Sequence, residues 1–171
     1  MKTNMFGRGC VLALVWVAAP VWFSCGKCSG RTTVVAAPIT PEQVVVQVRA
    51  AVETFAKSYE SRQVAALAAS YAHTDDLDVS AQGKRVRGWP AVEAHLGEFF
   101  RALTEVRLRL SDVTVSVVGS DGAIATAQAH RTYGDGVKTI DEYGALTLVL
   151  RRQGDAWSIV GEHFSYAPVN E

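Results

Sequence analysis

The chain has only three cysteines, and none of them lies beyond residue 28. Cys10, Cys25 and Cys28 all fall in or beside the N-terminal segment, so the rest of the chain can form neither a disulfide nor a thiol nucleophile. Its stability must therefore come from packing. Cys25 and Cys28 have the spacing of a redox pair, but no strand-helix unit that would stabilise a thiolate follows them.

The chain also lacks net charge, with 17 basic and 17 acidic residues. Because four of the basic residues and none of the acidic ones lie in the first 37 residues, the remainder is mildly acidic. Its one local cluster of basic residues is Lys84, Arg85 and Arg87. Nucleic acids attract proteins through clustered Lys and Arg that displace counterions. We therefore expect no nucleic-acid partner.

One long apolar run is present, from Val11 to Ser24, and it follows the basic residues Lys2 and Arg8. This length is typical of the core of a signal peptide and is too short for a comfortable membrane span. The pattern predicts a signal peptide over residues 1–24 and an exported protein of the periplasm or cell envelope. The run ends at Ser24-Cys25, which resembles a bacterial lipobox, although Trp22 stands where Leu is usual.

Two endings of this leader remain open. If Cys25 is lipidated, residues 25–38 form a flexible tether, and the lipid anchor is the only contact with the membrane. If the leader is instead cleaved near Val34-Val35-Ala36, whose small residues suit a signal peptidase, no cysteine remains in the mature chain.

The domain expected over residues 39–167 begins with strong helix signals. Thr40 suits the N-cap, Pro41 the first helical position, and Gln43 the return bond of a capping box. Ser61 is expected to cap a second, shorter helix that ends near His73. The predicted buried faces are Val44, Val48, Val52, Phe55 and Tyr59; then Val64, Leu67, Ala68 and Tyr71; and, in a third helix that opens at Gly88-Trp89-Pro90, Val92, Leu96, Phe99, Phe100 and Leu103.

Strand patterns occupy the rest of the domain. A short strand is expected from Leu77 to Ala81, followed by a turn at Gln82-Gly83. Later, apolar residues on even numbers up to Leu110 give way to apolar residues on odd numbers from Val113, so the alternation slips by one residue at Ser111-Asp112. Such a slip predicts a β-bulge, which bends a strand so that its sheet can curl around a cavity.

The last three strands complete an antiparallel meander. The first places a row of alanines (Ala123, Ala125, Ala127, Ala129) on one face, which leaves space for a close-packed helix or for a ligand. The next runs from about Thr139 to Arg152, with a bend at Gly144, and a strand containing Trp157 follows. We therefore expect an α+β fold in which three N-terminal helices pack on a strongly curved, mainly antiparallel sheet, a cone-shaped α+β barrel.

Three segments carry a resemblance to a known family. They are the helical stretch Leu67–Ala72, the helix entry Val86–Val92, and the closing strand Trp157–Ser165. With the order of elements, they make the chain similar to the nuclear transport factor 2-like superfamily, and specifically to its SnoaL-like branch, over roughly residues 41–165. The resemblance implies the cone fold and a homodimer formed through the sheet. It is a poor guide to activity, because one fold hosts many functions.

The ketosteroid isomerase-like members of this superfamily use a carboxylate base with an acid and a tyrosine in an apolar cone. The matching positions here fall near Ser80 or Ala81, near Ala145, and near Thr54 or Phe55, and none has the required chemistry. Asp76 or Asp78 would replace the base only in a different register. The resemblance therefore disfavours isomerase activity, leaves the catalytic residues unknown and implies no cofactor.

Aromatic and histidine side chains are the candidates for lining a cavity, although they serve equally well as ordinary core. His130 and His163 are candidates for a catalytic base or for metal ligands beside Asp141 or Glu162. Since Glu162 and His163 are adjacent on one strand and point to opposite faces, we expect no metal site. The pocket candidates are Tyr59, Tyr71, Trp89, Phe99, Phe100, His130, Tyr133, Trp157 and His163.

Two functions remain open at this point. The first is a non-catalytic envelope module that binds a small hydrophobic ligand or a partner protein. The second is an isomerase, cyclase or hydrolase that acts on a polyketide-, steroid- or epoxide-like molecule. Two or more ionisable groups that converge inside an apolar cavity would favour the enzyme, whereas a cavity filled by side chains would favour the binding module.

The first of these two endings predicts that the protein carries lipid on Cys25. Intact-mass spectrometry of the membrane fraction should show a mass above that of the polypeptide that begins at residue 25. Cys25→Ser should lose this mass and leave the membrane fraction, whereas Cys28→Ser should keep both. A wild-type chain that begins near residue 37 would contradict the prediction.

Overall fold

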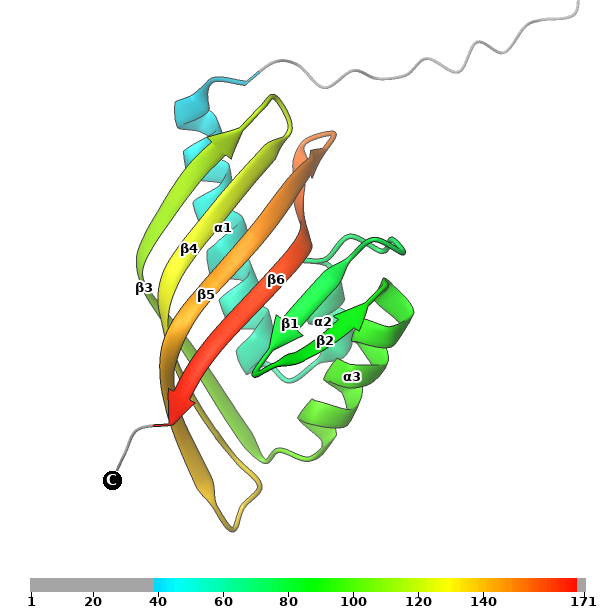
Figure 1. Ribbon diagram of the computed structural model, residues 1–171, viewed down its shortest axis with the longest axis vertical. Helices are drawn as coiled ribbons and strands as arrows, with labels where there is room; N and C mark the ends of the chain where they lie inside the picture. The colour runs from blue at the N-terminus through cyan, green and yellow to red at the C-terminus, as the bar shows by residue number, and fades with distance from the viewer. Residues whose placement is uncertain (1–38, 169–171) are drawn as a thin grey trace, which may run out of the picture. The chain divides into compact units, whose positions relative to one another are not determined.

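The computed structural model describes residues 39–168 of the 171-residue chain (Figure 1). The predicted signal peptide and tether lie outside these residues. Within them, the chain forms three helices and then a sheet, with one short hairpin between the second and third helices. The elements are α1 (Pro41–Glu60), α2 (Val64–Ala68), β1 (Asp78–Ala81), β2 (Lys84–Arg87), α3 (Trp89–Arg101), β3 (Glu105–Val118), β4 (Gly122–Gly134), β5 (Thr139–Gln153) and β6 (Ala156–Pro168).

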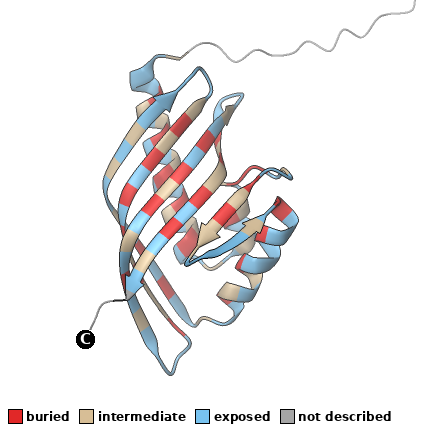
Figure 2. Cartoon of the chain, viewed as in Figure 1, coloured by how far each residue is buried: buried red, intermediate tan, exposed pale blue. Residues whose placement is uncertain are grey.

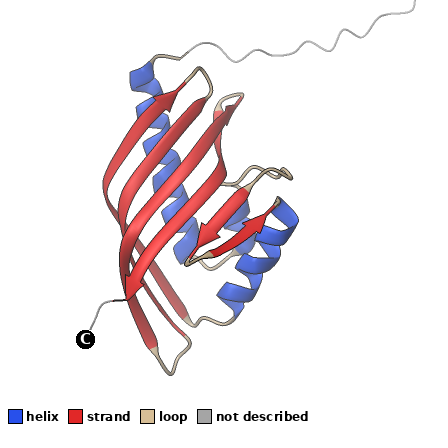
Figure 3. Ribbon diagram, viewed as in Figure 1, coloured by secondary structure: helices blue, strands red, loops and turns tan. Residues whose placement is uncertain are grey.

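The six strands form one sheet in the order β2-β1-β6-β5-β4-β3. Neighbouring strands are antiparallel except β1 and β6, which run parallel, so the sheet is mixed but mainly antiparallel. In the view of Figure 3, α1 passes behind the long strands and α3 lies beside the β1–β2 hairpin, and no helix of residues 39–168 covers the face of the long strands that is turned to the viewer, the open face of the sheet. Buried and exposed positions alternate along the long strands (Figure 2), as expected when one face covers a core and the other meets solvent.

The first helix begins as the sequence predicts. The Thr40 hydroxyl accepts a hydrogen bond from the backbone N–H of Gln43, and the Gln43 side chain accepts one from the N–H of Thr40, which completes the capping box. The five apolar residues predicted for its inner face are all buried. Residues of α1 and three alanines of β4 (Ala123, Ala125 and Ala129) belong to one core, so these small side chains serve helix packing.

The second helix is shorter than predicted, and Ser61 does not cap it. Ser61 instead ends α1, where its backbone N–H donates to Lys57 and Tyr59, and Arg62 then turns the chain with a φ of 56°. The helix ends at Ala68 because the next residues pair with β6. The backbone N–H of Ala72 donates to the carbonyl of Ile159 at 2.9 Å, and that of Ile159 donates to Ser70 at 2.8 Å.

The bulge predicted at Ser111-Asp112 is confirmed. The register of β3 against β4 shifts between Ser111 and Thr114, and Asp112 adopts a φ of 51°. The predicted strong curvature is wrong, because the sheet twists without curling into a cone. This bulge lies in the edge strand β3, and β1 and β2 at the opposite edge have only four residues each, too few to wrap the sheet around the helices.

None of the helices in the described part of the chain is long and apolar enough to cross a membrane.

Gly144 is the position in β5 where a side chain is least tolerable. A Cβ atom at this residue would lie 1.7 Å from the carbonyl oxygen of Ser165 on β6. We expect Gly144→Ala to lower the free energy of unfolding by about 1–3 kcal/mol or more, the usual cost of overpacking, in denaturant titrations.

Gly97→Ala is the matched control. Gly97 lies inside α3, and a Cβ atom there would have no neighbour within 4 Å. This variant should be more stable than the wild type by about 0.4–1 kcal/mol. Equal effects of the two substitutions would contradict the close approach of β5 and β6.

Candidate functional site

A cavity of about 220 Å³ lies between the covered face of the sheet, α3 and the β1–β2 hairpin. Buried side chains form its floor, and the exposed residues Gln82, Lys84 and His95 form its rim. Because drug-sized ligands occupy pockets of about 300–1,000 Å³, this cavity suits a smaller molecule. The floor and walls are made by Tyr59, Val79, Leu96, Phe99, Arg131, Tyr133, Glu162 and Phe164.

A bulge in β6 determines which residue of this strand reaches the cavity. Leu150 of β5 pairs with Ile159 and Val149 pairs with Gly161, so Val160 is an extra residue in β6. Before the bulge, Ile159 faces the core; after it, the even-numbered residues do. As a result, Glu162 points inward and His163 points outward.

Glu162 is the ionisable group on the cavity floor. Its Oε2 accepts a hydrogen bond from the Tyr71 hydroxyl, and its Oε1 has no hydrogen-bond partner among residues 39–168. Burial raises the pKa of Glu162 to about 7, against the opposing effects of the Tyr71 hydrogen bond and the charge of Arg131. A carboxyl group with this pKa both gives and takes a proton near neutral pH.

Arg131 provides the positive charge beneath the cavity. Its Nε and one terminal nitrogen donate to Glu142 Oε2 at 3.1 and 2.6 Å. The guanidinium also lies over aromatic rings, 4.0 Å from the ring centre of Tyr166 and 4.9 Å from that of Tyr133. Among the described residues, Arg131, Glu142 and Glu162 are the buried charged side chains.

Tyr59 lines the cavity together with Glu162 and is also hydrogen-bonded to Arg131. Its hydroxyl oxygen accepts a hydrogen bond from Arg131 at 3.2 Å, and its own proton has no acceptor among the described residues. Burial raises the pKa of Tyr59 to about 12, with a partial opposing effect from Arg131. Burial, together with the charge of Glu162, also raises the pKa of Tyr71. Both tyrosines are therefore protonated donors at neutral pH, while Glu162 titrates.

The structure places seven of the nine predicted pocket residues on the covered side of the sheet, and six of them lie at this site or next to it. Tyr59, Phe99 and Tyr133 line the cavity. The other four lie beside it or deeper in the core: Tyr71 bonded to Glu162, Trp89 packed on Tyr71 at 5.8 Å, Phe100 edge-on to Tyr59 at 5.2 Å, and Trp157, which is farther away and donates to Gln47 at 3.0 Å.

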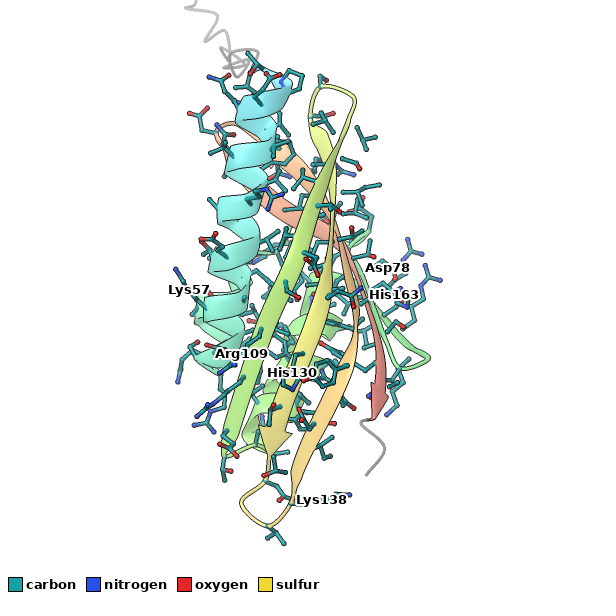
Figure 4. The ribbon with its side chains drawn as sticks, turned by 90° about the vertical axis from the view of Figure 1, so that its left-hand side faces the viewer. Lys57, Asp78, Arg109, His130, Lys138 and His163 are labelled. Carbon is teal, nitrogen blue, oxygen red and sulfur yellow. The ribbon has the colours of Figure 1, made fainter. Side chains whose placement is uncertain are left out.

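The two predicted histidines do not reach the cavity. His130 lies on the open face, where its ring contacts Asp141 and stacks on Tyr143 at 4.1 Å. His163 is exposed on the side of the sheet opposite α1 (Figure 4). His163 points away from the core because the extra residue in β6 shifts the alternation of that strand. His130 points away from the core because it alternates with the buried alanines of β4. No group of three His, Cys, Asp or Glu residues in the range 39–168 could hold a metal ion.

The acids considered as replacement bases also lie outside the cavity. Asp76 forms an ion pair with Arg151 at 3.7 Å, and Asp78 accepts two bonds from the Nε of Arg85. Neither residue lines the cavity.

The sequence predictions missed Arg131 and Glu142 entirely and considered Glu162 only as the partner of a histidine that binds a metal or acts as a base. A signal for the first two was present. Arg131 continues the odd-numbered row of buried alanines, and Glu142 continues the even-numbered row of Leu146, Leu148 and Leu150. No comparable signal marked Glu162, because its inward direction depends on the bulge at Val160.

Comparisons with solved structures support the fold. A proposed dehydratase of the NTF2-like family from Streptomyces avermitilis has 23% identity, a TM-score of 0.67 and coverage of 77% of this chain and 100% of its own. An NTF2-like protein from Salmonella enterica has 18% identity, a TM-score of 0.69 and coverage of 77% and 95%. A proposed scytalone dehydratase from Novosphingobium aromaticivorans has 13% identity, a TM-score of 0.65 and coverage of 71% and 83%. No curated protein matches the chain.

These structures share the α+β fold of this chain, in which helices pack on a mainly antiparallel sheet. The model of the SnoaL-like domain family matches residues 48–170, which is most of the chain. The protein therefore belongs to the SnoaL-like domain family, as the sequence resemblance predicted.

The raised pKa of Glu162 predicts a pH-dependent stability. Because the folded protein favours the neutral acid, this group stabilises the fold below the ordinary pKa of 4.5, and its contribution is lost as the pH rises through about 7. Glu162→Gln removes this titration. Between pH 4.5 and 8, its free energy of unfolding should therefore rise relative to wild type by about 3 kcal/mol.

Denaturant titrations across this pH range measure the difference. Glu93→Gln, at an exposed position of α3, is the control and should follow the wild-type profile at every pH. Parallel profiles for Glu162→Gln and wild type would contradict the perturbed carboxyl.

Proposed function

We propose that the domain binds a small, largely apolar molecule in the 220 Å³ cavity and exchanges a proton with it through Glu162. The observation that carries the proposal is a buried carboxyl group on the cavity floor with a pKa of about 7. Buried groups with pKa values near neutrality are typical of general acids and bases.

Tyr59 supplies the second group that such chemistry needs. Its hydroxyl is a protonated donor, and the bond that it accepts from Arg131 makes it a stronger one. A substrate carbonyl that accepts a bond from Tyr59 would place its α-carbon beside Glu162. The carboxylate would take the α-proton, and the electron pair of the C–H bond would pass to the carbonyl oxygen as an enolate that Tyr59 stabilises.

Two outcomes of this enolate are consistent with the site. If the substrate is a β,γ-unsaturated ketone, the enolate extends over the double bond, and return of the proton from Glu162 to the γ-carbon completes an isomerisation to the α,β-unsaturated ketone. Loss of a β-hydroxyl, which leaves as water with the proton from Glu162, completes a dehydration. Two of the solved structures with this fold come from proposed dehydratases, which supports the second outcome for a domain of the same superfamily.

Ligand binding without chemistry is the second candidate function. It is favoured because, among the described residues, the carboxylate of Glu162 is the one that lines the cavity and no cationic group donates a hydrogen bond to it, since Arg131 is paired with Glu142. A site with one free ionisable group needs no reaction to explain its aromatic walls.

The location and assembly of the protein stay proposals from the sequence. We propose an exported, cell-envelope protein anchored through Cys25, and a homodimer formed through the open face of the sheet. Tyr143 and Val149 are exposed on that face, and a row of paired threonines (Thr114, Thr126 and Thr147) would allow a second sheet to approach closely.

Solvent deuterium exchange tests the proton-transfer proposal. Small cyclic ketones with a β-hydroxyl group are incubated with the purified protein in D₂O, and NMR follows both exchange at the α-carbon and loss of water. We expect wild type to accelerate exchange, and Glu162→Gln to lose about 100-fold or more of this rate.

Saturation-transfer NMR on the same samples reports binding separately. Glu162→Gln should still bind the ketones, and the control Glu93→Gln should keep both binding and exchange. Binding with no exchange in wild type would reject proton transfer and leave the binding function. Exchange at the wild-type rate in Glu162→Gln would reject Glu162 as the base.

A further inference from the structure

The cluster of three basic residues in β2 is divided between the two sides of the hairpin. Arg85 and Arg87 face Asp78 on the neighbouring strand β1, with an Nε–Oδ2 distance of 2.8 Å for Arg85 and 4.0 Å for Arg87. Lys84 and Val86 alternate with these arginines and line the cavity. Two of the three positive charges are thus neutralised outside the cavity, and the third faces its opening.

Lys84 has no carboxylate partner among residues 39–168. His95 of α3 lines the same cavity and is also exposed, so the two residues meet its opening from the hairpin and from the helix. The third rim residue, Gln82, already donates its amide to Glu142 at 2.7 Å. The rim therefore offers an unpaired ammonium group and an imidazole, while the one carboxylate lining the cavity, that of Glu162, lies on the buried floor.

We propose that the ligand of this cavity is a small ring compound that carries a carboxylate, held at the rim by Lys84 with His95, while its ring extends toward Glu162. The inference rests on the proposed function and names the class of ligand for the same site. A carboxylate at this rim would form a charge-assisted hydrogen bond with the ammonium group. The apolar ring would then contact Leu96 and Phe99 on the cavity wall.

Matched pairs of compounds test this proposal. Aromatic and cyclic carboxylic acids, such as cinnamate, are compared with their primary amides, such as cinnamamide, by titration in protein NMR. The two members of a pair have the same shape and differ in charge. We expect the acids to bind wild type about 3- to 10-fold more tightly than their amides, the range for a partly exposed ion pair.

Two substitutions of Lys84 separate charge from structure. Lys84→Gln should abolish the preference for acids and leave the amides unaffected, and Lys84→Glu should reverse it. Lys138→Gln is the matched control, because Lys138 lies at the tip of the β4–β5 hairpin, away from this cavity (Figure 4), and its loss should leave the preference intact.

Each result has a distinct meaning. Equal binding of acids and amides by wild type, or equal loss of both in Lys84→Gln, would overturn the role of Lys84 while small-molecule binding stands. If no member of either series binds wild type, the binding function itself fails, and the ligand class falls with it.

Discussion

Arg131 is buried, so its positive charge needs hydrogen-bond and ion-pair partners inside the domain. The arrangement of the site depends on which residues supply these partners. A buried guanidinium is tolerated when a carboxylate and further polar groups surround it. Glu142 from β5 and Tyr59 from α1 supply these partners, and aromatic rings from β4 and β6 cover the remaining surface. One residue of β4 thereby holds together the helix and the central strands, and it fixes the hydroxyl of Tyr59 beside the cavity.

This pairing also explains why Glu162 differs from Glu142. Both carboxyl groups are buried on neighbouring strands, but the guanidinium bonds one of them directly and acts on the other only at a distance. Glu142 is thus a structural counter-ion, whereas Glu162 has a neutral tyrosine as its partner and keeps a pKa close to physiological pH. A single buried cation shared unequally between two acids leaves the second acid free for proton exchange.

Local patterns in the sequence were sufficient for most of the fold and insufficient for the site. The capping box at Thr40 and the bulge at Ser111-Asp112 were predictable, because each has a recognisable pattern in the sequence: the residue types of a helix cap, and a one-residue slip in the alternation of apolar residues. The bulge at Val160 has no such pattern, since Ile159 and Val160 are both apolar and Gly161 has no side chain. Strand pairing alone reveals it, and with it the inward direction of Glu162. The burial of Arg131 did leave a trace, because it continues the row of buried alanines, but its pairing with Glu142 could not be predicted from the sequence, since Glu142 belongs to another strand.

In the hairpin formed by β1 and β2, β1 pairs with the long strand β6, whereas β2 is the edge strand of the sheet. The turn of the hairpin is built from Gln82 and Gly83 in left-handed conformations. Lys84, which is proposed to select the ligand, therefore stands on a short edge strand, whereas Glu162 belongs to a long strand inside the sheet. Related proteins could exchange the exposed residues of β2 and acquire new ligands without disturbing the core. Divergence in this family would then be expected to concentrate in a few exposed positions, while the chemistry beneath them persists.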